Sequence, residues 1–158
     1  MSDKGSIIFG GRYELKKRIA RGGMAEVFLG EDQLLGRPVA VKVLFPEFAS
    51  DPNFVERFRR EAQAAANLSH PNIVGVFDWG KESNTYYIVM EYVEGRTLSQ
   101  IIRNEGPLPT ARVAEIADAI ASAVGFAHKG NVVHRDMKPG NVIISDTGQI
   151  KVADFGIA

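Results

Sequence analysis

Several short stretches in the first half of the chain alternate apolar and polar side chains with a period of two, which is typical of half-buried β-strands. The three nearest the N-terminus are Tyr13–Ile19, Ala25–Glu31 and Pro38–Leu44. Two later stretches with strand character, Val74–Trp79 and Tyr86–Met90, are joined by a polar turn. The pattern therefore predicts a sheet built from this half of the chain.

Other regions show apolar residues at helical spacing. Residues 52–68 carry this pattern after Asp51 and Pro52, which supply a helix start signal. Thr97–Asn104 is predicted to form a short helix and Thr110–Lys129 a longer one. The apolar stripe of the longer helix consists of Val113, Ile116, Ile120, Val124 and Ala127.

Together these elements predict an α+β fold with two lobes. Residues 1–12 are an N-terminal extension, and residues 13–91 form a sheet-rich lobe with one helix. Residues 92–96 are the predicted hinge, and residues 97–158 form a mainly helical lobe.

Composition and charge exclude several classes of protein. The 158 residues include 19 basic and 19 acidic side chains and no cysteine. A net charge near zero argues against broad binding to nucleic acids or anionic membranes, because both need a basic surplus. The lack of cysteine excludes disulfides, cysteine-ligated zinc and a thiol nucleophile, and is consistent with a cytoplasmic location. No apolar run approaches the roughly 18 residues of a membrane span, so no membrane segment is predicted.

A turn rich in small residues joins the first two predicted strands. It runs Ile19-Ala20-Arg21-Gly22-Gly23-Met24-Ala25-Glu26-Val27. Small residues let backbone amides approach phosphate oxygens closely. An ordinary tight hairpin has the same composition, so the turn alone leaves both interpretations open.

The third strand places a small residue beside a cation. In an extended chain Ala40 and Lys42 lie on one face, opposite the valines of the strand. That face can admit a flat ring next to an ammonium group that reaches phosphates. A solvated lysine is the plain alternative for Lys42. Glu61, on the helix that follows, is either its partner or an exposed helix glutamate.

The most informative motif is His134-Arg135-Asp136-Met137-Lys138-Pro139-Gly140-Asn141. It offers an acceptor for a hydroxyl proton, a cation for transferred charge and an amide oxygen for a metal. An ordinary polar loop is the alternative, and the neighbouring motifs make it the weaker one.

A predicted hairpin, Val142–Ser145 with Ile150–Ala153, leads to Asp154-Phe155-Gly156. If the turn is centred between Thr147 and Gly148, Asn141 lies opposite Asp154. An amide oxygen beside a carboxylate suits Mg²⁺, which takes few protein oxygens and completes its ligands with water and phosphate. The spacing therefore predicts a metal site made of Asn141 and Asp154.

In this order the motifs resemble those of the protein-kinase superfamily, most closely the eukaryotic-like serine/threonine kinases of bacteria. The similarity runs from about Gly11 to Ala158. It implies the two-lobe kinase fold, with an antiparallel-sheet N-lobe and an incomplete helical C-lobe. It also implies ATP and Mg²⁺ as cofactors, with Mn²⁺ able to replace Mg²⁺.

The resemblance implies a role for each motif residue. Lys42 would contact the α- and β-phosphates and pair with Glu61. Asp136 would accept the proton of the substrate hydroxyl, and Lys138 would lie beside the γ-phosphate. The metal ligands would be Asn141 and Asp154. The implied cofactor-binding set is Ile19, Ala20, Arg21, Gly22, Gly23, Met24, Ala25, Val27, Ala40, Lys42, Met90, Glu91, Val93 and Ile143.

Within this set Met90 resembles the gatekeeper, and residues 91–93 resemble the hinge whose backbone meets adenine. The resemblance also assigns four residues to a hydrophobic stack, namely Ala65, Val76, His134 and Phe155.

The chain departs from the family pattern in two places. The glycine-rich loop of the family is Gly-x-Gly-x-x-Gly, and here Ala20 and Ala25 replace its first and third glycines. In a left-handed backbone each alanine would cost about 1–2 kcal/mol; otherwise it only stiffens the loop. The chain also stops two residues after Gly156, before the activation segment and the remaining helices, which predicts a fragment of a longer kinase that is inactive alone.

The leading hypothesis is an ATP-dependent serine/threonine protein kinase acting on Ser and Thr hydroxyls of protein substrates. Lys138, two residues after Asp136, resembles the serine/threonine class rather than the tyrosine class. The alternative is a pseudokinase-like scaffold that binds nucleotide without turnover. The resemblance further implies a homodimer formed through the N-lobe, and a parent protein that is cytoplasmic or anchored to the membrane by a later segment.

Overall fold

The computed structural model describes residues 5–155, and the contacts within the chain divide it into two units. The first unit contains residues 5–59 and 76–92, and the second contains residues 60–75 and 93–155. Part of the predicted extension, residues 1–4, and residues 156–158, which include Gly156, lie outside the described residues.

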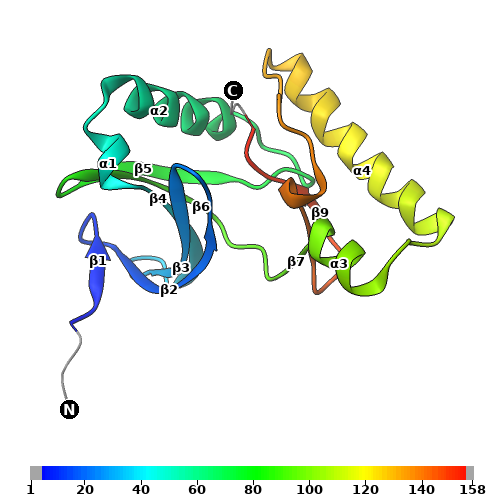
Figure 1. Cartoon of the computed structure of the whole chain (residues 1–158), viewed down its shortest axis with the longest axis horizontal. Coiled ribbons are helices and arrows are strands. Elements are labelled where there is room, and N and C mark those ends of the chain that lie inside the picture. The colour runs from blue at the N-terminus through cyan, green and yellow to red at the C-terminus, as the bar shows by residue number, and fades with distance from the viewer. Residues whose placement is uncertain (1–4, 156–158) are drawn as a thin grey trace. The chain divides into compact units, whose positions relative to one another are not determined.

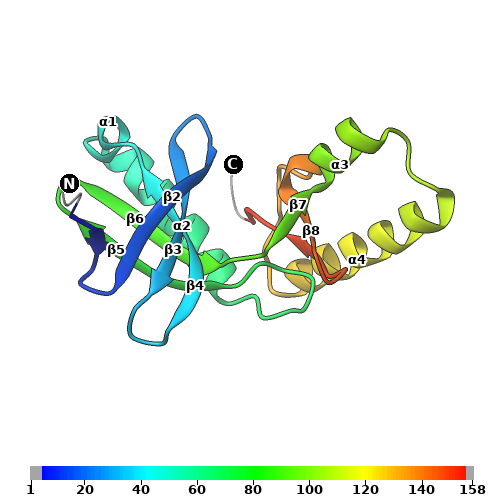
Figure 2. The same ribbon diagram turned by 90° about the horizontal axis from the view of Figure 1, so that it is seen from below.

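The first unit is built on one antiparallel sheet. Its strands are β1 (Ile7–Phe9), β2 (Tyr13–Arg21), β3 (Ala25–Asp32), β4 (Arg37–Leu44), β5 (Val76–Glu82) and β6 (Thr85–Glu91). Their order is β1-β2-β3-β4-β6-β5, and Figure 1 shows the sheet as a curved surface. Figure 2 shows β2, β3 and β4 side by side as successive hairpins of this sheet. The predicted antiparallel sheet is confirmed.

Two helices follow β4. The first, α1 (Pro46–Ala49), is a single turn, and α2 (Pro52–Ala66) begins in the first unit and ends in the second. On α2 the ring of Phe58 packs edge-on against Trp79 of β5, with ring centroids 5.8 Å apart. The helical pattern predicts α2, but it does not predict α1 or β1, because three or four residues are too few to show a period.

The core of the first unit lies on one face of the sheet. Its buried members are Tyr13, Val39, Val41, Val43, Tyr87 and Val89. The hydroxyl of Tyr13 donates to the Oδ2 atom of Asp78 at 2.6 Å, so the polar end of this buried ring has a partner. Because the valines of β4 fill this face, the intervening residues of β4 point to the opposite one.

A buried carboxylate links the residue that precedes β2 to the turn between β3 and β4. Asp32, at the end of β3, has no exposed surface. Its two oxygens accept hydrogen bonds from Nε and Nη2 of Arg12, both at 2.8 Å. Backbone N–H groups of Leu34 and Leu35 donate to the same carboxylate from the β3–β4 turn. The hydrogen bonds from Arg12, helped by those from the turn, lower the pKa of Asp32 from 3.8 to about 2.

This carboxylate should make the folded chain sensitive to acid. A pKa lowered by folding stabilises the fold fully above the ordinary value of 3.8, and the contribution is lost as the pH falls towards about 2. Urea unfolding across this range should show the free energy of unfolding dropping as acid is added. The variant Asp32→Asn should be less stable at neutral pH and should lose less on acidification. An equal acid-induced loss in wild type and variant would contradict the assignment.

The second unit combines a small sheet with helices. Its elements are β7 (Gly95–Thr97), α3 (Leu98–Glu105), α4 (Thr110–Lys129), the 3₁₀ helix η1 (Pro139–Asn141), β8 (Val142–Ser145) and β9 (Ile150–Val152). The strands pair antiparallel in the order β7-β8-β9. Their core consists of Ile101, Ile116, Ala119, Val142, Ile144 and Ile150.

The strand β7 begins inside the segment predicted as a hinge. It pairs with β8, placing Gly95 opposite Ser145. A Cβ atom at Gly95 would collide with the carbonyl oxygen of Ile144, so glycine permits this close approach. A capping box then starts α3, since the side chains of Thr97 and Gln100 each accept the other's backbone N–H. Three residues paired only with a distant strand carry no local pattern, which is why the sequence does not predict β7.

The helix α4 has the predicted bounds, but its buried line differs from the predicted stripe. Ile116 and Ala127 are buried as predicted, together with Ala119 and Ala123. Val113 is 50% exposed, and the two other stripe residues are half-buried. The helix therefore packs mainly through its small side chains, which spacing of large apolar residues alone does not reveal. No helix within residues 5–155 combines the length and apolar character needed to cross a membrane.

The β8–β9 hairpin forms as predicted, but its register is shifted by one residue. Val142 lies opposite Val152, whereas a turn centred between Thr147 and Gly148 would place it opposite the next residue. The turn contains three residues instead of two. Gly148 adopts a φ of +90°, the left-handed conformation that closes three-residue hairpin loops.

Candidate active site

Neighbouring strands bring four predicted nucleotide-binding residues to one face of the first sheet. Val27 on β3 lies opposite Lys42 on β4, and Ala40 on β4 lies opposite Met90 on β6. Residues opposite each other on paired strands share a face. The predicted placement of Ala40 and Lys42 on the face away from the core valines is confirmed. Their contact with a nucleotide stays a prediction.

The small-residue loop is a tight hairpin between β2 and β3. The N–H of Gly22 donates to the carbonyl oxygen of Ala25 at 2.8 Å. Residues 19–23 are exposed, whereas Ala25 is buried. Within residues 5–155 the non-glycine residues with positive φ do not include Ala20 or Ala25. Neither alanine is strained, so the cost of about 1–2 kcal/mol for a left-handed alanine does not arise.

Restoring either family glycine should therefore change nucleotide binding little. We expect Ala20→Gly and Ala25→Gly each to alter the Kd for Mg-ATP by less than about tenfold, or 1.4 kcal/mol. Ala25→Gly should also lower stability by about 0.5–1 kcal/mol, because glycine frees the unfolded backbone within a strand. Calorimetric titration of both variants checks this. A hundredfold gain in affinity would mean that the alanines impair the loop.

In the second unit, His134 connects the His-Arg-Asp motif to the end of β9. The residue is 2% exposed. Its Nδ1 atom accepts from the backbone N–H of Asp136 at 3.1 Å, so Nε2 carries the proton. Nε2 donates to the carbonyl oxygen of Ala153 at 2.7 Å. The ring also meets Phe155 edge-on, with centroids 4.6 Å apart. A buried neutral histidine thus fixes Asp136 relative to the residues that precede Asp154.

The side chains of Asp136 and Lys138 form an ion pair at the surface. Nζ of Lys138 lies 3.2 Å from Oδ2 of Asp136, and the two side chains are 58% and 44% exposed. Arg135 has a φ of +72°, a left-handed conformation that costs a non-glycine residue about 1 kcal/mol or more. Such strain persists where surrounding contacts enforce it, and the two hydrogen bonds of His134 supply them. A carboxylate and an ammonium group are therefore held side by side.

Asn141, which is 7% exposed, is anchored to the same loop. Its Nδ2 atom donates to the backbone carbonyl oxygen of Asp136 at 2.9 Å. Because this bond uses the amide nitrogen, the amide oxygen is the atom through which Asn141 can bind a cation. Oxygen ligands of this kind suit Mg²⁺.

The predicted direct opposition of Asn141 and Asp154 is wrong. The carbonyl oxygen of Asn141 accepts from the N–H of Ala153 at 2.8 Å, one residue before Asp154. The three-residue turn of the hairpin causes this shift. Asp154, two residues after the end of β9, has a φ of +62°. Their joint role as metal ligands stays a prediction. It rests on the chemistry of their side chains and on the family resemblance, because the strand register does not place them opposite each other.

Residues 5–155 contain no group of three or more His, Asp or Glu side chains placed to hold a metal ion. Mg²⁺ bound together with a nucleotide does not need such a group, because phosphate oxygens and water complete its shell. One carboxylate and one amide oxygen are a sufficient protein contribution, so the residues present fit this cation.

The other predicted contacts join residues of different units and stay predictions. Lys42 is in the first unit and Glu61 in the second. The predicted cofactor-binding residues divide in the same way. Val27, Ala40, Met90 and Glu91 are in the first unit, and Val93 and Ile143 are in the second.

Sequence reasoning missed the hydrogen bonds of His134, which it assigned to a hydrophobic stack. The available signal is the spacing, because the ring of a histidine in a loop can reach the backbone N–H two residues later, as His134 reaches that of Asp136. The same geometry occurs at His70, where Nδ1 accepts from the N–H of Asn72 at 3.0 Å. Short-range bonds from side chain to backbone hold loops in this way in place of regular structure.

Comparison with known families identifies this arrangement. A family model described as the protein kinase domain matches residues 13–158. The chain belongs to the protein kinase family. The predicted kinase-like fold and the resemblance to bacterial serine/threonine kinases are confirmed.

Named relatives of this kinase chain are bacterial. Serine/threonine-protein kinase PrkC of Bacillus subtilis is 52% identical over 148 residues, which cover 94% of this chain and 23% of PrkC. Serine/threonine-protein kinase PknA of Mycobacterium tuberculosis is 45% identical over 163 residues, covering 100% of this chain and 38% of PknA. The crystal structure of the M. tuberculosis PknI kinase domain matches with a TM-score of 0.84 and 36% identity, covering 97% of this chain and 62% of that one. The chain thus spans 23% to 38% of the length of these curated relatives.

Proposed function

We propose that this chain supplies the nucleotide-binding and catalytic-loop residues of an ATP-dependent serine/threonine protein kinase. The observation that carries the proposal is the hydrogen-bonded loop of His134, Asp136 and Asn141. It holds a carboxylate, the neighbouring Lys138 ammonium and an amide oxygen in one fixed segment. The names of the relatives, each a serine/threonine-protein kinase, support the same reaction.

The catalytic loop would act on the substrate hydroxyl. When bound, Mg-ATP supplies the phosphoryl group to be transferred. Asp136 orients the Ser or Thr hydroxyl of a protein substrate and accepts its proton. Lys138, 3.2 Å from that carboxylate, stabilises negative charge next to it. Asn141 and Asp154 would hold Mg²⁺, or Mn²⁺ in its place, through their side-chain oxygens.

The first unit would hold the nucleotide. Val27 and Ala40 share a sheet face with Lys42, so an apolar surface for adenine lies next to a cation for the α- and β-phosphates. We expect Glu61 to orient Lys42 by an ion pair. The exposed β2–β3 loop would offer its backbone amides to the phosphates.

Activity, partners and location of the full-length gene product are part of the proposal. We expect a protein substrate with Ser or Thr, a homodimer formed through the sheet-rich lobe, and a cytoplasmic kinase domain. The 158-residue chain spans 62% of the PknI kinase-domain chain. We expect the 158-residue chain by itself to bind nucleotide without phosphorylating a peptide.

Thermal unfolding of the 158-residue chain with and without Mg-ATP tests nucleotide binding. Ligand at 100 times its Kd stabilises a fold by about 2.7 kcal/mol. For a chain of this size that raises Tm by roughly 5–10 °C. Lys42→Met should lose most of the shift, and the matched variant Lys81→Met, at an exposed position on β5, should keep it.

Two results would count against the proposal in different ways. A wild-type chain with no shift at millimolar Mg-ATP would contradict nucleotide binding. A normal shift, combined with no phosphoryl transfer by the full-length gene product, would favour the pseudokinase-like scaffold.

A further inference from the structure

The residue that follows β4, Phe45, contacts both ends of the β2–β3 loop. The guanidinium carbon of Arg21, the last residue of β2, lies over the Phe45 ring, 5.3 Å from its centre. The backbone N–H of Phe45 donates to the carbonyl oxygen of Met24, which precedes β3, at 2.8 Å. Only Gly22 and Gly23 lie between these two contacts. A single residue of another segment therefore holds the tip of the hairpin from both sides.

The stacking of Arg21 on Phe45 has the geometry of a cation–π contact. A cation within about 6 Å of a ring centre is attracted by the negative face of the ring. Arg21 is exposed and Phe45 is half-buried, so the guanidinium rests on the ring and still meets water. Glu26, which lies opposite Arg21 across the hairpin, pairs with Arg18 instead at 3.5 Å. The side chain of Arg21 is thus directed to the ring and not to its cross-strand neighbour.

Phe45 is itself held firmly by the first unit. It follows Leu44, which has no exposed surface, and its carbonyl oxygen accepts from the N–H of Phe48 at 2.9 Å in the single turn of α1. The ring of Phe48 meets Phe54 of α2 edge-on, with centroids 4.9 Å apart. Two adjacent glycines leave the loop tip free to adopt many conformations, and Phe45 ties that tip to a fixed point.

We propose that Phe45 is a positioning residue for the phosphates of ATP. It holds Arg21 and Met24, and thereby keeps the backbone amides of the loop between them in the arrangement that binds phosphate oxygens. The inference rests on the proposed function, because it assumes that this loop meets the nucleotide. It assigns Arg21 an indirect part, through the Phe45 ring, in place of a direct bond to a phosphate.

This role has a consequence that depends on the ligand. A loop that is ordered before binding does not have to be ordered by the ligand, so its anchor raises affinity only for ligands that use the loop. Adenosine carries no phosphate and does not need the loop amides. Loss of the anchor should therefore weaken binding of Mg-ATP and leave binding of adenosine unchanged.

Calorimetric titration of the 158-residue chain with Mg-ATP and with adenosine tests this. Arg21→Gln and Phe45→Leu should each raise the Kd for Mg-ATP about two- to fivefold, the value of an exposed cation–π contact, without changing the Kd for adenosine. The double variant should lose no more than either single one, because both substitutions remove the same contact. Arg21→Lys keeps a cation and Phe45→Trp keeps an aromatic face, so both should bind Mg-ATP like wild type.

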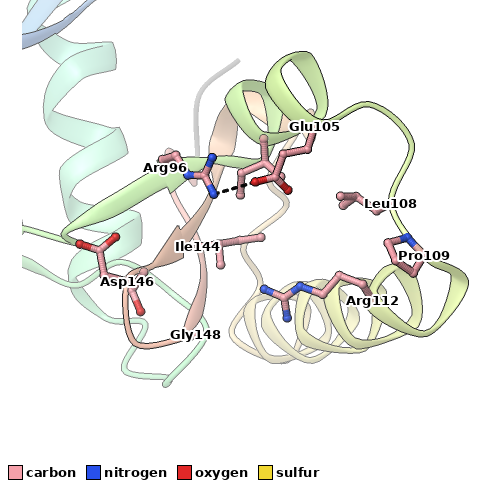
Figure 3. Close-up of a pocket in the computed structure, with 10 residues that line it drawn as sticks. Arg96, Glu105, Leu108, Pro109, Arg112, Ile144, Asp146 and Gly148 are labelled. Atoms are coloured by element: carbon pink, nitrogen blue, oxygen red, sulfur yellow. Dashed lines mark hydrogen bonds and ion pairs between the residues drawn. The ribbon is translucent and has the colours of Figure 1, made fainter.

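Two control variants remove similar interactions elsewhere. Phe77→Leu removes the ring on which Arg37, the first residue of β4, stacks at 4.0 Å, at the opposite end of that strand from Phe45. Arg112→Gln removes an arginine of the second unit that pairs with Glu115 at 2.8 Å, and Figure 3 shows its side chain extending from α4. Both should bind the two ligands like wild type. Thermal unfolding identifies any variant that fails to fold, and the exposed Arg21→Gln still tests the anchor if Phe45→Leu does not fold.

Several outcomes would overturn the inference. Weaker Mg-ATP binding in Arg21→Gln with wild-type binding in a folded Phe45→Leu would mean that Arg21 contacts the phosphates directly. Equal weakening of Mg-ATP and adenosine would mean that the substitutions distort the sheet, and additive losses in the double variant would mean that the two residues act separately. Wild-type Mg-ATP binding in both single variants would overturn this inference alone. A wild-type chain that binds no Mg-ATP would contradict the proposed function and this inference with it.

Discussion

Replacing Asp136 by asparagine should reduce phosphoryl transfer by the full-length gene product roughly 10²–10⁴-fold, the contribution typical of a positioned general base. The substitution should leave the loop in place, because the loop is held by the backbone of Asp136. Its N–H donates to His134 and its carbonyl oxygen accepts from Asn141, and asparagine keeps both groups. The loss should therefore be in kcat, with the Kd for Mg-ATP changed by less than about threefold.

Single-turnover transfer and calorimetric nucleotide binding measure the two effects separately. Asp118→Asn, at an exposed position on α4, is the matched control and should behave like wild type. An Asp136→Asn enzyme that retains more than a tenth of wild-type turnover would remove Asp136 from the proposed role. A parallel loss of nucleotide affinity would show that the carboxylate positions the nucleotide instead.

Most of the secondary structure could be predicted because it follows from local patterns. The helix at 110–129 has the predicted bounds, since apolar spacing continues until Gly130. The placement of Lys42 beside Ala40 also follows from strand alternation alone. Features determined by contacts between distant residues could not be predicted in this way. The strand at 95–97 exists only through its pairing with β8.

The candidate site shows the same division. The chemical identity of its groups could be predicted, because Asp136, Lys138 and Asn141 lie within six residues of one another. Their geometry could not. The hairpin register depends on whether Gly148 takes a left-handed backbone, and a two-residue and a three-residue turn fit the same sequence. A change of one residue in the turn moves every opposing pair along the strands.

The contact between His134 and Ala153 is the clearest example of a feature that the sequence does not predict. It joins residues 19 positions apart through a side-chain nitrogen and a backbone oxygen, and no local pattern marks the acceptor. This contact also decides the tautomer of the ring, and so permits the second bond to Asp136. Sequence reasoning could place His134 near Phe155, which the ring contact confirms, but not assign these two polar bonds.

Replacing His134 by phenylalanine should therefore destabilise the chain although the ring stacking is kept. Phenylalanine can still meet Phe155 edge-on, but the N–H of Asp136 and the carbonyl oxygen of Ala153 lose their partner. Both bonds are part-buried, and each group left without a partner costs up to about 1–3 kcal/mol. We expect a loss of up to roughly 2–6 kcal/mol in the free energy of unfolding, or a fall in Tm of up to about 4–24 °C.

Urea and thermal unfolding of the 158-residue chain measure this loss, with His128→Phe as the exposed-histidine control on α4. In the full-length gene product the same substitution should also slow phosphoryl transfer, because Arg135 would no longer be held in its left-handed conformation and Asp136 would lose its fixed position. Wild-type stability in His134→Phe would mean that ring packing, and not the hydrogen bonds, holds the catalytic loop. Reduced stability with full turnover would mean that the loop finds the same geometry without them, and that Asp136 is positioned by Asn141 alone.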